Sequence, residues 1–211
     1  SPLPPDPFAE GPEGPFQIFV TGTDTGVGKT QASCALLSLL VDAGLKPQGF
    51  KPYESGCTSL AAPADTLAMR EAARSELPVD ALCPHRFRAP LAPGVAARRL
   101  GQEPDWSATL AAWERLRQGP VVVEGAGGLF VPIDSRRDII DLIGALRLPV
   151  LLVARAGLGT LNHTALSLRA RLRLRPPSLP PRGGVPGGVH RGRVQVDPAL
   201  QATRIRHVQF P

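Results

Sequence analysis

Residues 22–30 carry the most specific chemistry in this sequence, the run Gly-Thr-Asp-Thr-Gly-Val-Gly-Lys-Thr. Binding a chain of phosphates needs backbone N–H groups that converge on its oxygens, a helix N-terminus behind them and a cation above. The glycines let the backbone curl, Lys29 supplies the cation, and the hydroxyl of Thr30 can coordinate Mg²⁺. Five residues separate Gly22 from Gly28, one more than in the usual loop. The run therefore predicts a lengthened phosphate-binding loop.

A second chemical feature is Glu124, which follows the apolar run at 120–123 and precedes the small residues of 125–128. A carboxylate at such a strand end is where phosphoryl-transfer folds place a Mg²⁺ ligand or a group that orients water. The small residues let a ligand approach the backbone closely, and their N–H groups can stabilise developing negative charge. Beside a phosphate loop, this pattern favours a metal role for Glu124.

Lys51, Ser55 and Asp65 carry weaker signals. Lys51 follows a short strand-like run and precedes Pro52, but an isolated lysine is as often solvated surface as a phosphate contact. Ser55 has no informative spacing, and Asp65 fits a helix N-cap as well as it fits a ligand. Spacing alone leaves the roles of these three residues open.

Alternating strands and helices must position these residues. Short apolar runs predict strands at 16–21, 47–51, 120–123 and 149–154, and helical spacing predicts helices at 29–43, 65–74, 106–118, 138–146 and within 157–171. This alternation predicts a single α/β domain over residues 16–174 with a doubly wound, mostly parallel sheet, and the phosphate loop after its first strand makes that sheet similar to the P-loop NTPase type. In such sheets the functional loops follow the C-terminal ends of strands. The phosphate loop, the segment that begins at Lys51 and the segment that begins at Glu124 all have this position.

The two ends of the sequence differ from this domain. Residues 1–15 include six prolines and few apolar side chains, a composition that predicts disorder. Residues 175–211 form a Pro/Arg/Gly-rich tail without strand or helix periodicity. From Arg169 onward there are nine arginines and one acid, a contribution of +8 to the net charge of +6, so the residues before Arg169 sum to −2. The predicted domain is thus slightly acidic, and the basic character belongs to the tail.

The composition also bears on the cellular location of the protein and on whether it binds zinc. No run approaches the roughly 18 apolar residues of a membrane span, and no secretory leader opens the sequence, so we expect a cytoplasmic protein without membrane contact. The three cysteines have neither CxxC nor zinc-ligand spacing.

Together the motifs resemble the dethiobiotin synthetase family. The resemblance rests on four segments: residues 19–25 with 27–30, Lys51-Pro52 with Ser55-Gly56, residues 123–128, and Leu158-Gly159 with Asn162-His163. These segments occur in the family's order between about residues 16 and 171. The first loop is shared with partition-type ATPases, whereas its combination with the other segments is much narrower.

The resemblance implies an ATP- and Mg²⁺-dependent cyclo-ligase of biotin biosynthesis. Family members convert 7,8-diaminononanoate, CO₂ and ATP into dethiobiotin, ADP and phosphate, through a carbamate and a carbamic-phosphoric anhydride. They are homodimers, and the substrate carboxylate lies at a helix N-terminus of the partner chain. Residues 159–162 are the matching segment here.

The resemblance also implies a role for each matching position. Lys51, Lys29 and Thr25 would be catalytic, and Ser55 and Asn162 would contact the diamine. The metal would be held by Thr30, Asp65 and Glu124. The full set expected to bind the nucleotide and its metal is Gly26, Val27, Gly28, Lys29, Thr30, Gln31, Asp65, Glu124, Gly125, Ala126 and Gly127.

The tail departs from the family pattern. The family's next strand and its asparagine-bearing loop help to recognise adenine, and neither has a match after residue 174. The abrupt change in composition suggests the hypothesis that the stretch from about Arg175 reflects a reading-frame error or truncation. A continuous frame on resequencing, with tail peptides recovered by mass spectrometry, would contradict it.

Two other functions stay open. A partition-type ATPase switch would share the lengthened loop but would need neither Lys51 nor Ser55. Nucleic-acid binding through the arginine-rich tail would be nonspecific and strongly salt-dependent, and we do not expect it of the domain.

Overall fold

The computed structural model describes residues 14–172 and contains six strands and seven helices within that range. In chain order they are β1 (Gln17–Gly22), α1 (Lys29–Asp42), β2 (Gln48–Phe50), β3 (Tyr53–Ser55), α2 (Ala64–Ala72), α3 (Val79–Leu82), β4 (His85–Phe87), α4 (Pro93–Arg99), α5 (Trp106–Leu116), β5 (Val121–Glu124), α6 (Ile139–Leu146), β6 (Val150–Val153) and α7 (Thr160–Leu172). The predicted tail, 175–211, lies outside the described residues, as do residues 1–13 of the predicted N-terminal segment.

Four strands form one parallel sheet in the order β2-β5-β1-β6. The register aligns Val20 of β1 with Glu124 of β5, and Phe50 of β2 with Val123 of β5. β5 therefore ends at Glu124, level with Val20, while β1 continues two residues further to Gly22. Lys51, the residue after β2, lies beside Glu124. Parallel pairing thus brings the phosphate loop, Glu124 and Lys51 to one edge of the sheet.

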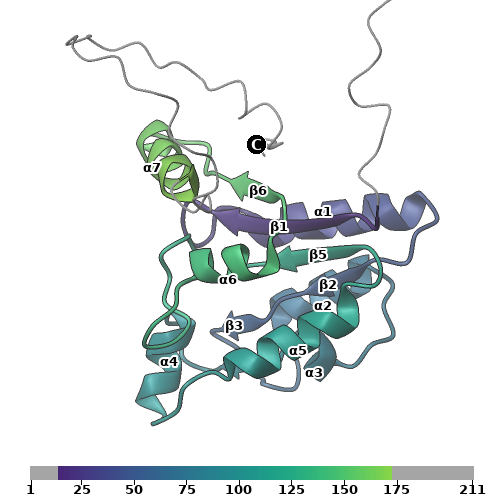
Figure 1. Cartoon of the computed structure of the whole chain (residues 1–211), viewed down its shortest axis with the longest axis horizontal. Helices are drawn as coiled ribbons and strands as arrows, with labels where there is room; N and C mark the ends of the chain where they lie inside the picture. The colour runs from purple at the N-terminus through teal and green to yellow at the C-terminus, as the bar shows by residue number, and fades with distance from the viewer. Residues whose placement is uncertain (1–13, 173–211) are drawn as a thin grey trace, which may run out of the picture.

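Helices cover both faces of this sheet, as the doubly wound prediction requires (Figure 1). Because neighbouring side chains of a strand point to opposite faces, Phe19 and Val20 belong to separate core clusters. The Phe19 cluster packs against α5 and α6, which face the viewer in Figure 1. The Val20 cluster packs against α1 and α2 behind the sheet. Each fully buried aliphatic side chain contributes about 1.5–3 kcal/mol, so this core stabilises the loops at the sheet edge.

Gly49 lets α2 approach β2 closely. A Cβ at Gly49 would lie 2.8 Å from the Cβ of Met69 and 3.2 Å from a methyl carbon of Leu37. No larger residue fits without moving the helix. The close approach matters for the site because α2 carries Asp65 and β2 leads into Lys51.

The structure confirms the α/β class and the main helices and strands, but it adds elements that the prediction missed. No strand was predicted between residues 52 and 119, whereas β3 forms at Tyr53–Ser55 and pairs in parallel with β4. The helices α3 and α4 were also missed. These elements have three to seven residues, too few to show a period, and tertiary contacts such as the stacking of Tyr53 on His85 hold them.

Within residues 14–172, none of the helices is both long enough and apolar enough to cross a membrane.

Candidate active site

The phosphate loop leaves β1 at Gly22 and ends where α1 begins. Gly28 caps α1 with a φ of 99°, and Gly26 has a φ of 72°, both in the left-handed region that favours glycine. A Cβ at Gly22 would lie 2.8 Å from the carbonyl oxygen of Asp24, so the curl also needs glycine there. The predicted roles of all three glycines in shaping the loop agree with this geometry.

Lys29 folds back over the loop, and its Nζ donates a hydrogen bond of 2.9 Å to the carbonyl oxygen of Asp24. The side chain is largely buried. Burial and then the nearby Lys51 lower the pKa of Lys29 to about 8, partly opposed by Glu124. A cation held this way at the start of α1 is placed to meet a phosphate, whose charge would offset the repulsion between the two lysines.

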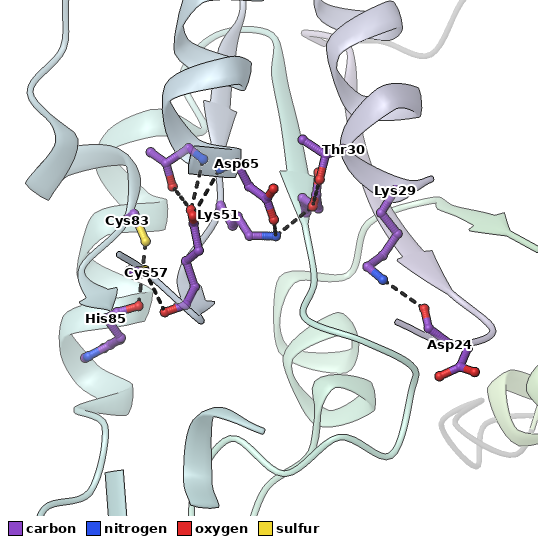
Figure 2. Close-up of polar contacts among 11 residues, drawn as sticks. Asp24, Lys29, Thr30, Lys51, Cys57, Asp65, Cys83 and His85 are labelled. Atoms are coloured by element: carbon purple, nitrogen blue, oxygen red, sulfur yellow. Dashed lines mark hydrogen bonds and ion pairs between the residues drawn. The ribbon is translucent and has the colours of Figure 1, made fainter. Parts of the chain in front are cut away.

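The side chains of Thr30, Lys51, Asp65 and Glu124 meet at the carboxyl edge of the sheet, where Figure 2 labels the first three. The Lys51 Nζ lies 2.6 Å from Glu124 Oε1 and 3.0 Å from Asp65 Oδ2. The Thr30 hydroxyl donates to the same Glu124 Oε1 at 2.9 Å. Sequence spacing left the roles of Lys51 and Asp65 open, and the fold places Lys51 between the carboxylates of Asp65 and Glu124.

Lys51 and Glu124 are both almost completely buried. Burial alone lowers the pKa of Lys51, but Glu124 and Asp65 outweigh it and hold the pKa above its usual value. Lys51 is therefore a fixed cation under physiological conditions. A buried charge is tolerated only when it is paired in this way.

One carboxylate oxygen of the cluster has no hydrogen-bond partner within residues 14–172. Glu124 Oε2 is buried and accepts no hydrogen bond among the described residues. An unpaired carboxylate oxygen next to a threonine hydroxyl suits a hard cation, which prefers oxygen ligands. No group of three or more His, Cys, Asp and Glu side chains within residues 14–172 could hold a metal alone, so a cation here would need the hydroxyl, phosphate oxygens or water as further ligands.

Asp65 is the second residue of α2, whose N-cap is Pro63. The alternative interpretation of Asp65 as an N-cap is therefore wrong. The carboxylate that accepts from the first turn comes instead from Glu54 on β3, which receives the N–H groups of Asp65 and Thr66 at 3.0 and 2.9 Å. Because the helix is capped from outside, Asp65 is left to pair with Lys51.

A cavity of about 760 Å³ opens between the phosphate loop, Lys51 and α4. Its lining includes most of the predicted site residues, namely Thr25, Gly26, Gly28, Lys29, Thr30, Gln31, Lys51, Ser55, Asp65, Glu124, Ala126 and Gly127. Pro90, Leu91 and Val131 add apolar surface to the same lining. The cavity therefore combines charged and hydroxyl-bearing side chains with apolar ones.

Three predicted residues do not line this cavity. The side chain of Val27 packs on the core behind the loop, which leaves only its backbone for a phosphate. The N–H of Gly125 donates to the carbonyl of Val20 at 2.9 Å, and a Cβ there would face Phe19. Gly125 thus continues the strand pairing, and the expectation that its N–H meets negative charge is wrong. Asn162 lies exposed in the first turn of α7.

The structure adds residues that sequence reasoning missed. Glu54 and Tyr53 line the cavity, and Tyr53 bonds the hydroxyl of Thr109 at 2.8 Å while stacking on His85. Burial raises the pKa of Tyr53 to about 12 and lowers that of His85. Glu54 could have been found from the sequence because it is a charged residue three positions after Lys51 and next to Ser55.

Comparisons with known proteins agree with this geometry. A family model described as an AAA domain matches residues 17–208. The ATP-dependent dethiobiotin synthetase BioD of Anaeromyxobacter dehalogenans (strain 2CP-C) is 52% identical over 155 residues, which cover 72% of this chain and 69% of the relative. The proteins of the same name from Ralstonia nicotianae and Bacillus subtilis (strain 168) are 45% and 39% identical, over 74% and 72% of this chain and 70% and 67% of the relatives.

Among solved structures, the cell division protein FtsY of Thermotoga maritima matches 79% of this chain and 51% of its own, with a TM-score of 0.41 and 20% identity, a likeness too slight to inform the site. The curated relatives are much nearer, and each is matched over at least two thirds of its length. This chain belongs to the ATP-dependent dethiobiotin synthetase family.

Proposed function

We propose that this protein is an ATP-dependent dethiobiotin synthetase, which forms the ureido ring of dethiobiotin from 7,8-diaminononanoate, CO₂ and ATP, with release of ADP and phosphate. The observation that carries the proposal is the meeting of Lys29, Lys51, Thr30 and Glu124 in a cavity that also has apolar lining residues. The charged side chains suit phosphates and a carbamate, and the apolar ones suit an aliphatic chain.

The proposed reaction has three steps. One amine of the substrate adds to CO₂ and loses a proton, which gives a carbamate. A carbamate oxygen then attacks the γ-phosphorus, and ADP leaves. The second amine attacks the carbonyl carbon of this mixed anhydride and loses a proton as phosphate leaves and the ring closes. The second step brings two anions together, so positive charge must offset their repulsion.

The chain's own residues would serve these steps as follows. The N–H groups of residues 26–31 and the Nζ of Lys29 would hold the phosphates. Lys51 would neutralise the carbamate and the γ-phosphate, with Thr25 touching phosphate or substrate. Ser55 would contact the diamine. Correct placement of two reactants can by itself supply on the order of 7–11 kcal/mol of a barrier.

Mg²⁺ completes the proposed site. Thr30, Asp65 and Glu124 would hold it, with phosphate oxygens and water as the remaining ligands. The unpaired Oε2 of Glu124 supports this assignment. When bound, the ion would neutralise charge on the transferring phosphoryl group.

We also propose a homodimer, in which residues 159–162 of one protomer meet the substrate carboxylate in the other. Leu158, just before α7, and Leu161 and Leu166 within it support this arrangement, because they are exposed at 105%, 85% and 56%. Asn162 would then contact substrate across the interface. The three free cysteines agree with a reducing cytoplasm, a location that cell fractionation would test.

The first test is turnover by the purified protein with Mg-ATP, bicarbonate and 7,8-diaminononanoate. We expect phosphate release to depend on the diamine and to be abolished by EDTA. ATP hydrolysis independent of the diamine would favour a partition-type ATPase switch. Absence of turnover together with salt-sensitive DNA binding would favour the nucleic-acid interpretation.

We expect Lys51→Ala to lower diamine-dependent kcat by roughly 10²–10³-fold, the usual loss for a group that stabilises transition-state charge. ADP affinity should stay close to that of the wild type, because Lys29 and the loop hold the phosphates. Lys46→Ala removes an exposed lysine and serves as the matched control. Full activity of Lys51→Ala would remove this residue from the mechanism.

We expect Glu124→Gln to raise the Mg²⁺ concentration needed for half-maximal activity and to lower kcat, because the amide ligates hard cations more weakly than a carboxylate. Glu114→Gln makes the same change on the exposed surface of α5 and should match the wild type. Activity measured against Mg²⁺ concentration checks this. An unchanged Mg²⁺ dependence would argue against Glu124 as a ligand.

We expect Leu161→Asp to convert the dimer to a monomer in sedimentation analysis, because it would bury a charge in an apolar interface. Leu39→Asp, on the exposed surface of α1, is the control and should remain dimeric. A dimer that survives Leu161→Asp would place the interface elsewhere.

A further inference from the structure

Glu54 is a buried carboxylate that the proposed chemistry does not use. It lies in the middle of β3 and is 4% exposed. Its Oε1 accepts from the N–H of Asp65 at 3.0 Å, and its Oε2 accepts from the N–H and the hydroxyl of Thr66 at 2.9 and 2.7 Å. All three donors belong to the first turn of α2.

This arrangement replaces an ordinary helix cap. The N-cap of α2 is Pro63, whose side chain cannot accept a hydrogen bond. The N–H groups of a first turn have no partner within the helix, so those of Asp65 and Thr66 depend on Glu54. Unlike a local cap, Glu54 comes from another element and therefore ties α2 to β3.

The segment that carries Glu54 holds α2 a second time. Lys51, three residues earlier, pairs with the carboxylate of Asp65 at 3.0 Å. Glu54 thus binds the backbone of Asp65 while Lys51 binds its side chain. The side chain of Asp65 is 43% exposed, so packing restrains it little and these two contacts set its direction.

The contact depends on the negative charge of Glu54. Among the described residues no cation pairs with it, and the positive end of the helix dipole compensates its charge instead. A glutamine has the same shape, but its NH₂ group would face one of the N–H donors. That substitution would break half of the contact and weaken the tie.

We propose that Glu54 is a positioning residue, which fixes the N-terminus of α2 so that Asp65 faces Lys51 and the metal position beside Thr30 and Glu124. The proposal rests on the proposed function, since it assigns Asp65 to the metal. Groups that orient a metal ligand from behind commonly change metal affinity or activity by about 10–100-fold when they are replaced.

The test is Glu54→Gln in the full chain, with two measurements. Mn²⁺ binding in the presence of ADP, followed by the EPR signal of free Mn²⁺, should weaken by about 10–100-fold. The kcat of diamine-dependent phosphate release should fall by a similar factor, while the KM for ATP changes little. Glu71→Gln removes an exposed carboxylate from the same helix and should behave as the wild type in both.

A double variant separates positioning from simple capping. Glu54→Gln/Pro63→Ser gives α2 a local N-cap but no tie to β3, so it should regain thermal stability while Mn²⁺ affinity and kcat stay low. If the single variant does not fold, Mn²⁺ affinity and kcat are measured on the double variant instead. Recovery of Mn²⁺ affinity in the double variant, or a Glu54→Gln variant that binds Mn²⁺ like Glu71→Gln, would overturn the proposal.

The two proposals can fail separately. A wild type that binds Mn²⁺ and ADP but shows no diamine-dependent turnover would refute the proposed function, and the Mn²⁺ titration of the variants would still decide the role of Glu54. A wild type that turns over with an unaffected Glu54→Gln variant would refute only the positioning role.

Discussion

The buried pair between Lys51 and Glu124 is the interaction on which the site depends. Removing two charges from water is costly, and the 2.6 Å contact offsets that cost only while both partners stay in place. The pairing of β2 with β5 enforces their placement, because Phe50 lies opposite Val123 and each strand then delivers its charged residue. Two buried charges thus lie where parallel strand pairing fixes their positions.

The other parts of the site are arranged around this pair. The loop from β1 brings Thr30 to the same oxygen that Lys51 contacts, and Gly49 lets α2 come close enough for Asp65 to reach Lys51. Two carboxylates around one lysine leave the cluster with an excess of negative charge and one unpaired oxygen. That imbalance favours a divalent cation, which would also free Lys51 to meet an anionic substrate.

The lining of the cavity combines charged and apolar side chains. Lys29 and Lys51 supply positive charge, and Leu91 and Val131 supply apolar surface. Leu91 comes from the segment before α4 and Val131 from the loop after β5, and α4 meets that loop where Gly94 approaches the backbone of Ile133. This combination suits an aliphatic substrate whose reacting amines must meet ATP.

The sequence by itself determined the phosphate loop, the alternation of strands and helices, and Glu124 at the end of its strand. These signals are local, since each depends on neighbouring residues and their period. Only the tertiary structure decided that Lys51 pairs with both Asp65 and Glu124, and that the N–H of Gly125 donates to a carbonyl of β1. It also decided that Glu54 caps α2. Those outcomes depend on strand register and on the close approach of segments far apart in the chain. The sequence does not predict them, because a contact between distant residues produces no periodic pattern in it.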